Sequence, residues 1–191
     1  MILATFYLLL TYLLASIPFG LLLSVIVADI DPRTAGSRNI GATNVYRLAG
    51  ARLGALTLVA DMLKGFLPAL LAPLVHPGPY FVGLVAFTAF AGHCYSAYLN
   101  FKGGKGVATA TGVFLAISPI ATIISFVTWL VIVRLTRRSS LGALTATVLL
   151  LPLMYGLTPD SLWIGVIIAV GIVIRHIDNI RRLLGGTELS T

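Results

Sequence analysis

Long stretches without a charged residue alternate with short polar segments along this sequence. A helix that crosses a bilayer needs about 20 predominantly apolar residues, and most of the uncharged stretches reach that length. We therefore predict an all-α polytopic membrane protein in which residues 1–191 form one domain. The uncharged stretches are 1–28, 79–99, 107–133, 139–159 and 161–174, and the stretch 53–75 contains only Asp61 and Lys64 as charges.

The stretch 107–133 decides the predicted topology. It forms either one tilted helix or two short helices broken at Ser118-Pro119, because proline disfavours helix at the preceding residue. All 13 lysines and arginines except Lys64 lie outside the apolar stretches. With the break, those basic residues fall on one side of the membrane, in agreement with the positive-inside rule. We predict about seven transmembrane helices, a short fourth and fifth helix, the N-terminus outside and the C-terminus in the cytoplasm.

The composition supports a membrane protein and excludes several other classes. Only 10% of the residues are charged, against roughly 25% in a soluble domain. The net charge of +7 would favour nucleic acid as the partner of a soluble protein, but here the basic residues flank apolar stretches, so we predict the lipid bilayer as the partner and no nucleic acid. Residues 1–28 lack a basic start and are expected to be a retained helix. The single cysteine, Cys94, excludes an internal disulfide, and we predict no metal and no cofactor.

The first polar segment, AGSRNIGATNVYR at 35–47, combines glycines with small polar residues and ends in an arginine. Backbone N–H groups in such turns can form an anion-binding nest, and an arginine can grip phosphate with two hydrogen bonds. The alternative is an ordinary capped loop, because Asn and Thr are common turn and N-cap residues. The candidate ligand groups are Gly36, Ser37, Asn39, Gly41, Thr43, Asn44 and Arg47.

The second polar segment, FKGGKGVAT at 101–109, is rich in glycine and lysine. Glycines let the backbone approach a ligand closely, a following helix presents its positive N-terminal end, and lysine supplies a point charge to phosphate. The segment is not a Walker A loop, because no Ser or Thr follows the Gly-Lys pair and no strand precedes it. The alternative is a flexible loop whose lysines anchor at the lipid headgroups.

The third polar segment is RHIDNIRRLLGGTE at 175–188. His176 and Asn179 are three residues apart and therefore share one face of a helix. A histidine and an asparagine at a membrane exit are also common as interfacial anchors, so both interpretations stay open for this segment alone.

Three ionisable residues fall within the predicted membrane segments. Asp61 and Lys64 are three residues apart, so they can pair with each other or face a shared polar cavity. We favour a structural ion pair that supports a site. His93 near the end of the third helix is either a ligand donor or a packed polar residue. Together with the three polar segments on one membrane face, these residues favour a site without metal for two anionic or phosphorylated groups.

Four motifs in order make this sequence resemble the bacterial acyl-phosphate-dependent glycerol-3-phosphate acyltransferases. They are GSRNIGATNVYR at 36–47, DMLKGFLPAL at 61–70, GHCYSAYLNFKGGKGVAT at 92–109 and RHIDNIRRLLGGTE at 175–188, and the likeness covers nearly the whole chain. One departure is Arg38, where the family usually has glycine. If that position needs a positive φ, arginine strains the turn by about 1–2 kcal/mol.

The resemblance implies transfer of a fatty acyl group from acyl phosphate to the 1-hydroxyl of glycerol 3-phosphate. The products are lysophosphatidic acid and inorganic phosphate, in the first acylation of phospholipid synthesis. It further implies a multi-pass protein of the bacterial cytoplasmic (inner) membrane, with the active site facing the cytoplasm. The donor would be acyl phosphate rather than acyl-CoA or acyl carrier protein.

Within that reaction we assign roles to the candidate residues. Catalytic roles fall to His176, Asn179 and Lys105, and glycerol 3-phosphate is assigned to Ser37, Arg47 and Lys105. The acyl phosphate is assigned to Asn39, Gly41, Thr43, Asn44, Gly103, Gly104 and Gly106, and supporting roles to Asp61, Lys64, His93 and Glu188.

Two questions have more than one answer at this point: which group accepts the hydroxyl proton, and whether the protein is an enzyme or belongs to another class. The chain has neither a Gly-x-Ser-x-Gly elbow nor a His-x4-Asp motif, since Tyr98 follows His93 after five residues. The departing phosphate and His176 are the two candidate proton acceptors. A transporter or flippase of an anionic lipid precursor is the rival function, but only Asp61 and Lys64 supply polar groups near the membrane midplane. A non-catalytic scaffold would have no use for three glycine-rich cationic segments.

Overall fold

A computed structural model describes all of residues 1–191 as helices joined by short connections, with no strand. The helices are α1 (Ile2–Ser16), α2 (Phe19–Ala28), α3 (Ala42–Val75), α4 (Pro79–Cys94), α5 (Val107–Ile117), α6 (Pro119–Thr136), α7 (Ser139–Leu157), α8 (Leu162–Arg175) and α9 (Ile177–Leu184), with 3-10 turns η1 (Ala97–Leu99) and η2 (Pro159–Ser161).

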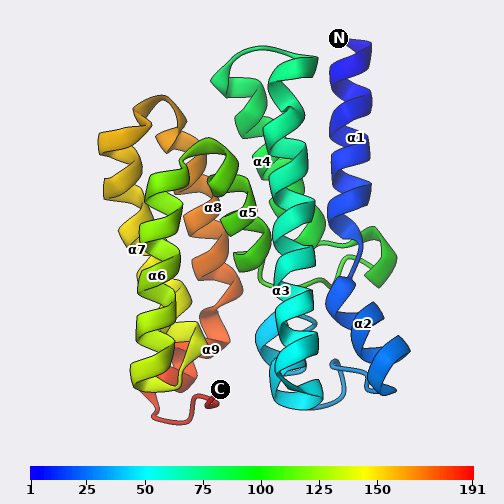
Figure 1. Cartoon of the computed structure of the whole chain (residues 1–191), viewed down its shortest axis with the longest axis vertical. Coiled ribbons are helices and arrows are strands. Elements are labelled where there is room, and N and C mark those ends of the chain that lie inside the picture. The colour runs from blue at the N-terminus through cyan, green and yellow to red at the C-terminus, as the bar shows by residue number, and fades with distance from the viewer.

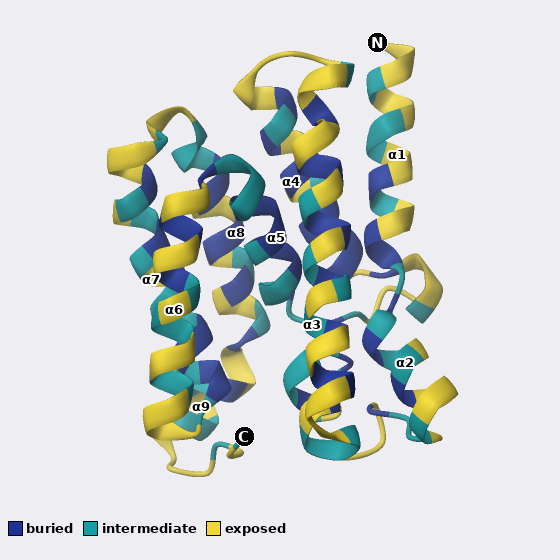
Figure 2. Ribbon diagram, viewed as in Figure 1, coloured by how far each residue is buried: buried dark blue, intermediate teal, exposed yellow.

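The all-α membrane class is confirmed, whereas the count of seven spans stays a prediction. By length and composition, five helical segments can cross a membrane, or six if the pair α8 and α9, bent by 60°, is one span. Helix α5 is apolar but shorter. Many large apolar side chains are exposed on the outside of the bundle. Figure 2 shows that α1, α3 and α6 carry exposed residues along their outer faces.

Proline sets two of the helix boundaries. The predicted break at Ser118-Pro119 is confirmed, since α5 ends at Ile117 and α6 begins at Pro119. The expectation of a short fifth helix was wrong, because α6 continues past Arg134 and reaches 18 residues. The single helix expected over 1–28 was also wrong. Pro18 keeps Ile17 out of helical conformation (ψ 119°), so the stretch divides into α1 and α2.

Helix α3 begins earlier than the charge pattern indicated. It starts at Ala42, so the predicted loop 35–47 is a loop only as far as Gly41. Gly50, with φ 85° and ψ 176°, interrupts the helix and separates its first turns from the long part after residue 50. Thr43, Asn44 and Arg47 therefore project from a rigid helical turn.

The helices form two groups, with α1–α5 on one side and α6–α9 on the other (Figure 1). The closest packing is between α3 and α5, where Gly65 faces the Thr109 carbonyl and Gly112 faces the Met62 carbonyl. A Cβ at either glycine would clash with that backbone, and small residues at such crossings are typical of membrane helices. The two chain ends lie at opposite ends of the bundle, and the α2–α3 loop, the α6–α7 turn and α9 all lie at the C-terminal end.

Candidate functional site

A cavity of about 160 Å³ lies between the two groups of helices. Its apolar part includes Phe114, Phe126, Trp129, Leu150 and Ile172, from α5, α6, α7 and α8. Most of the sequence-predicted site residues line it: Ser37, Asn39, Gly41, Thr43, Asn44, Arg47, Asp61, His93, Lys105, Gly106, His176, Asn179 and Glu188. Gly36, Gly103, Gly104 and Lys64 do not line it. The fold thus joins the three polar segments at one cavity that also has an apolar interior.

Asn44 folds the first polar segment back onto α3. Its Oδ1 accepts a hydrogen bond from the Ser37 N–H at 2.8 Å, and its Nδ2 donates to the carbonyls of Pro32, Ala35 and Asn39 at 2.8, 3.2 and 2.9 Å. The amide is buried and fully used by the loop. Asn44 therefore holds Ser37 at the cavity instead of offering its own amide to a ligand, which revises the expected cradle role.

Asn39 and Thr43 also use their polar groups within the protein. Asn39 Oδ1 accepts from the Gly41 N–H at 2.9 Å, which fixes the turn just before α3. Thr43 Oγ1 lies 2.9 Å from Ser139 Oγ at the start of α7, so these two hydroxyls connect the two helix groups beside the cavity.

Arg38 occupies the turn in left-handed conformation, with φ 54°. The position therefore does need a positive φ, and a non-glycine residue in that conformation costs about 1–2 kcal/mol. The turn nevertheless closes normally, with the Arg38 N–H donating to the Ala35 carbonyl at 3.0 Å.

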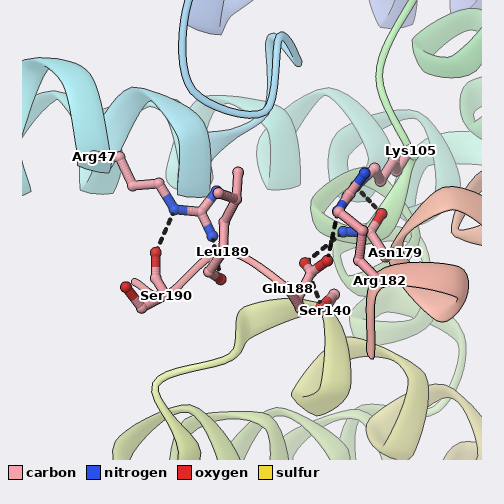
Figure 3. Close-up of polar contacts among 8 residues, drawn as sticks. All are labelled: Arg47, Lys105, Ser140, Asn179, Arg182, Glu188, Leu189 and Ser190. Carbon is pink, nitrogen blue, oxygen red and sulfur yellow. Dashed lines mark hydrogen bonds and ion pairs between the residues drawn. The ribbon is translucent and has the colours of Figure 1, made fainter. Parts of the chain in front are cut away.

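Arg47 reaches from α3 to the C-terminal residues (Figure 3). Its Nε donates to the Ser190 carbonyl at 2.7 Å and its Nη2 to the Leu189 carbonyl at 3.2 Å. These two parallel bonds use the guanidinium in the bidentate manner expected for a phosphate. A phosphate bound at Arg47 would have to replace the two carbonyls.

Lys105 belongs to a chain of hydrogen bonds that we call the mouth network, drawn in Figure 3. Lys105 Nζ donates to Asn179 Oδ1, and Asn179 Nδ2 donates to Glu188 at 2.6 Å. Glu188 also accepts from Ser140 and from Arg182, both at 2.8 Å. The mouth network, made of Lys105, Asn179, Glu188, Ser140 and Arg182, thereby connects the second polar segment to α7 and α9.

The charges of the mouth network are tuned by burial and by each other. Burial lowers the pKa of Lys105 to about 8, even though the nearby Glu188 carboxylate favours the charged form. Burial opposes ionisation of Glu188, but the hydrogen bonds from Asn179, Ser140 and Arg182 outweigh it and lower the pKa of the carboxyl group. Lys105 is therefore a cation that gives up its proton only slightly above neutral pH.

His176 lies at the bend between α8 and α9 and lines the cavity. Its Nδ1 is 2.8 Å from the Ile172 carbonyl. A carbonyl only accepts, so Nδ1 carries the proton and Nε2 of the neutral ring is left as an acceptor. Burial, and then the Lys105 cation, lower the pKa of His176 to about 4, so the ring is neutral at physiological pH.

Gly103 and Gly104 pack against the end of α4 and offer no N–H groups to the cavity. Their N–H groups donate to the carbonyls of Cys94 and His93 at 3.0 and 3.1 Å. A Cβ on Gly104 would collide with His93 Nε2, so glycine is needed there for close packing. This revises the expected cradle. The free donors are the first-turn N–H groups of α5, where Gly106, Val107 and Ala108 line the cavity.

The ionisable residues within the membrane segments form, together with Thr109, a second, buried group that we call the inner cluster: Asp61, Lys64, His93 and Thr109. Lys64 Nζ lies 2.7 Å from Asp61 Oδ1 and donates at 2.8 Å to the Ile17 carbonyl. That carbonyl is at the break between α1 and α2, so the lysine serves both the ion pair and the helix break. His93 Nδ1 is 3.1 Å from Thr109 Oγ1 and 3.8 Å from Asp61. The favoured interpretation of Asp61 and Lys64 as an ion pair agrees with this geometry.

Sequence reasoning missed four residues of this region: Ser139, Ser140, Arg175 and Arg182. The serines follow Arg137 and Arg138 at the first turn of α7, where small polar residues are common and carry no signal of their own. Arg175 and Arg182 were counted only as loop charges. Their contacts depend on segments distant in sequence, which no local pattern reveals.

The chain is similar to known proteins over almost its whole length. The glycerol-3-phosphate acyltransferase family model matches residues 5–186. A glycerol-3-phosphate acyltransferase from Solidesulfovibrio magneticus is 48% identical over 188 residues, covering 98% of this chain and 94% of that protein. One from Syntrophotalea carbinolica is 45% identical and covers 96% of each chain.

Two solved structures are similar over almost the whole chain. The crystal structure of PlsY (YgiH), an integral membrane glycerol 3-phosphate acyltransferase, in its glycerol 3-phosphate form has a TM-score of 0.92 and 38% identity, covering 98% of this chain and 95% of that one. The lysophosphatidic acid form of PlsY has a TM-score of 0.88 at the same identity, with 98% and 94% covered.

Proposed function

Because the chain belongs to the glycerol-3-phosphate acyltransferase family, we propose that it transfers a fatty acyl group from acyl phosphate to the 1-hydroxyl of glycerol 3-phosphate. The products are lysophosphatidic acid and inorganic phosphate, and PlsY has structures in a glycerol 3-phosphate form and a lysophosphatidic acid form. The observation that carries the proposal is one cavity with a cationic, hydroxyl-rich mouth and an apolar interior. Such a cavity suits two phosphate groups and one acyl chain.

Arg47 and Lys105 are the proposed ligands of the glycerol 3-phosphate phosphate group, with Ser37 beside them. Arg47 already binds two carbonyl oxygens in a bidentate manner, and a phosphate presents the same geometry with a full negative charge. Lys105 lies on the other side of the mouth, held by Asn179. Two cations from different segments thereby fix both the position and the orientation of the acceptor.

The acyl phosphate is assigned to the first turn of α5 and to the apolar interior. The free N–H groups after Gly106 point their partial positive charge at the cavity, which favours the phosphate and the oxyanion that forms at the carbonyl. The acyl chain would lie among the apolar residues of α5–α8. Holding a mixed anhydride next to a hydroxyl supplies much of the rate, because orientation alone is worth up to about 7–11 kcal/mol.

The departing phosphate is the proposed acceptor of the hydroxyl proton. The phosphate oxygen freed from the anhydride is at least as basic as a phosphate monoester dianion, whose pKa is about 6, whereas the pKa of His176 is lowered to about 4. The phosphate is thus the stronger base. His176 Nε2 accepts the hydrogen bond of the glycerol hydroxyl and orients it, and Asn179 holds Lys105.

Replacement of His176 by Gln separates these two roles. Because Gln keeps a hydrogen-bonding group but cannot act as a base, we expect KM for glycerol 3-phosphate to rise more than kcat falls. The pH–rate profile should keep its shape. Loss of the acidic limb of that profile in H176Q, measured from pH 3 to 9 so that the range includes the His176 pKa of about 4, would instead make histidine the base.

The proposed setting is the bacterial cytoplasmic membrane, with the mouth of the cavity on the cytoplasmic face. The α2–α3 loop, the α6–α7 turn and α9, which carry most of the basic residues, lie at the end of the bundle that holds the C-terminus, whereas the connection between α4 and α5 lies nearer the middle (Figure 1). The positive-inside rule favours the cytoplasm for the end with most of the basic residues. Labelling of single cysteines, each introduced into a Cys94→Ala background, in whole cells tests this orientation. A cysteine at Ser190 should be protected from an impermeant reagent, and a cysteine at Pro77 should react.

The donor is tested by comparing palmitoyl phosphate, palmitoyl-CoA and palmitoyl acyl carrier protein with labelled glycerol 3-phosphate and purified protein. We expect lysophosphatidic acid from palmitoyl phosphate alone. A comparable or faster rate with either thioester would contradict the proposed donor while leaving the acyl transfer to glycerol 3-phosphate intact.

A further inference from the structure

We propose that Arg175 is a positioning residue that holds the glycine segment, residues 103–106, and through it Lys105, against the C-terminal helices. The proposal rests on the function given above, because it assigns Lys105 to the acceptor phosphate. Arg175 is the last residue of α8 and has no place in the chemistry described so far.

The contacts of Arg175 fix its guanidinium in one orientation. Nε donates to the Gly104 carbonyl at 3.1 Å and Nη2 donates to the Gly103 carbonyl at 3.0 Å. The guanidinium also stacks over the Tyr95 ring, with Cζ 5.6 Å from the ring centre. A planar fork that bridges two successive carbonyls is a task for arginine that lysine cannot repeat.

The glycine segment is held from its opposite side as well. The N–H groups of Gly103 and Gly104 donate to the end of α4, at the carbonyls of Cys94 and His93. Each of the two glycines thus donates its N–H to α4 and accepts from Arg175 at its carbonyl. Loss of Arg175 would leave the two carbonyls without their charged donor, on the side that faces α8.

A second contact with the glycine segment comes from the residues just after the bend between α8 and α9. The helices α8 and α9 meet at 60°, and Asn179, just after the bend, accepts from Lys105 Nζ. Lys105 follows Gly104 directly, so Arg175 holds the backbone while Asn179 holds the side chain of the next residue. His176 lies between these two residues, so one short stretch sets the relative position of Lys105 and the histidine.

The first test measures Lys105 directly and needs no activity. Wild-type protein and R175A are treated with a trace amount of acetic anhydride, and acetylation of Lys105 is compared with that of Lys102 by peptide mass spectrometry. Lys102 is exposed in the same loop and serves as the internal standard. We expect the Lys105/Lys102 ratio to rise about tenfold in R175A, the factor for one hydrogen bond to a charged group.

The second test measures kinetics with palmitoyl phosphate and glycerol 3-phosphate. R175A should raise KM for glycerol 3-phosphate about tenfold, with a much smaller change in kcat. R175K should lie between R175A and wild type, and free guanidinium should restore KM in R175A. The matched control is R181A, which removes an exposed arginine of α9 whose partner is Asp178, and it should leave both readouts unchanged.

The outcomes separate the two proposals. If the wild-type protein is inactive but the labelling of Lys105 still changes in R175A, the proposed function is contradicted and the positioning role of Arg175 is supported. If the wild-type protein is active but R175A changes neither the labelling of Lys105 nor KM for glycerol 3-phosphate, the positioning role is overturned. A change in labelling without a change in KM overturns it as well. If R175A does not fold, the same two measurements are made on R175K and Y95A. Each of these variants keeps part of the contacts among residue 175, the two glycine carbonyls and the Tyr95 ring.

Discussion

The inner cluster and the mouth network are two groups of buried charges in one small protein, and their lysines differ in what they face. In the inner cluster, Lys64 is enclosed, and its partners are Asp61 and the Ile17 carbonyl. In the mouth network, Lys105 and Glu188 line the cavity and connect three separate segments. From the comparison we infer that Lys64, whose partners are internal, supports the fold, and we propose that Lys105, which borders the cavity, serves a ligand.

The largest expected effect is on the inner cluster. Lys64→Ala leaves the Asp61 carboxylate and the Ile17 carbonyl without their partner, and breaking a buried ion pair costs about 3–5 kcal/mol. We expect a large drop in the unfolding midpoint in detergent. The double variant D61A/K64A should recover part of that loss, because no lone charge remains. A midpoint for Lys64→Ala equal to that of the surface variant Lys102→Ala would contradict the assignment.

The next effect belongs to the mouth network. Lys105→Ala removes a cation that borders the cavity, and if it binds substrate as proposed, loss of one such group costs about 10²–10³ in turnover. The unfolding midpoint should stay close to wild type, in contrast to Lys64→Ala. Lys102→Ala, in the same loop but exposed, should keep full activity. Wild-type rates in Lys105→Ala would mean that the mouth network does not bind substrate.

The pH dependence sharpens the comparison further. The Lys105 pKa of about 8 means that the free enzyme loses this cation as the pH rises through 8, so phosphate binds less well above that pH. We expect kcat/KM for glycerol 3-phosphate to fall about tenfold per pH unit on the alkaline side. In Lys105→Arg the guanidinium stays charged, and that limb should move upward by several units. An unchanged limb in the arginine variant would assign it to another group.

The smallest effect lies outside both groups, at Arg38. Glycine would remove the cost of the left-handed conformation, about 1–2 kcal/mol, but it also gains unfolded-state entropy worth about 0.4–1 kcal/mol. Arg38→Gly should therefore stabilise the protein by about 1 kcal/mol or less. Arg52→Gly, within the helical part of α3, should destabilise it by about 1 kcal/mol. A loss of stability in Arg38→Gly would show that the arginine makes a compensating contact.

Features that depend on local chemistry were predictable from the sequence. Uncharged stretches identified the membrane helices, and Pro119 marked the α5–α6 break because its ring acts on the residue just before it. The same reasoning applied to Pro18 would have predicted the α1–α2 break. The break was missed because residues 1–28 contain no charge, so the charge pattern gave no reason to divide them. The three polar segments were recognised as parts of one site because their basic residues had to share a membrane face.

Features that depend on tertiary partners were not predictable. Asn44 and Gly104 carry the residue types of an anion cradle, yet one is used by its own loop and the other by His93. Both are short, adaptable groups, and only the folded chain decides whether a ligand or the protein takes their hydrogen bonds. Arg47, Ser140 and Arg175 likewise depend on segments more than 45 residues away.

The central claim is that this cavity joins acyl phosphate and glycerol 3-phosphate. The most direct measurement is release of inorganic phosphate by purified protein from palmitoyl phosphate, with and without glycerol 3-phosphate and without added metal. We predict release that depends on the acceptor and yields one lysophosphatidic acid for each phosphate. Folded protein that shows no acceptor-dependent release, in both the wild type and Arg38→Gly, would contradict the account and favour a carrier of an anionic lipid precursor.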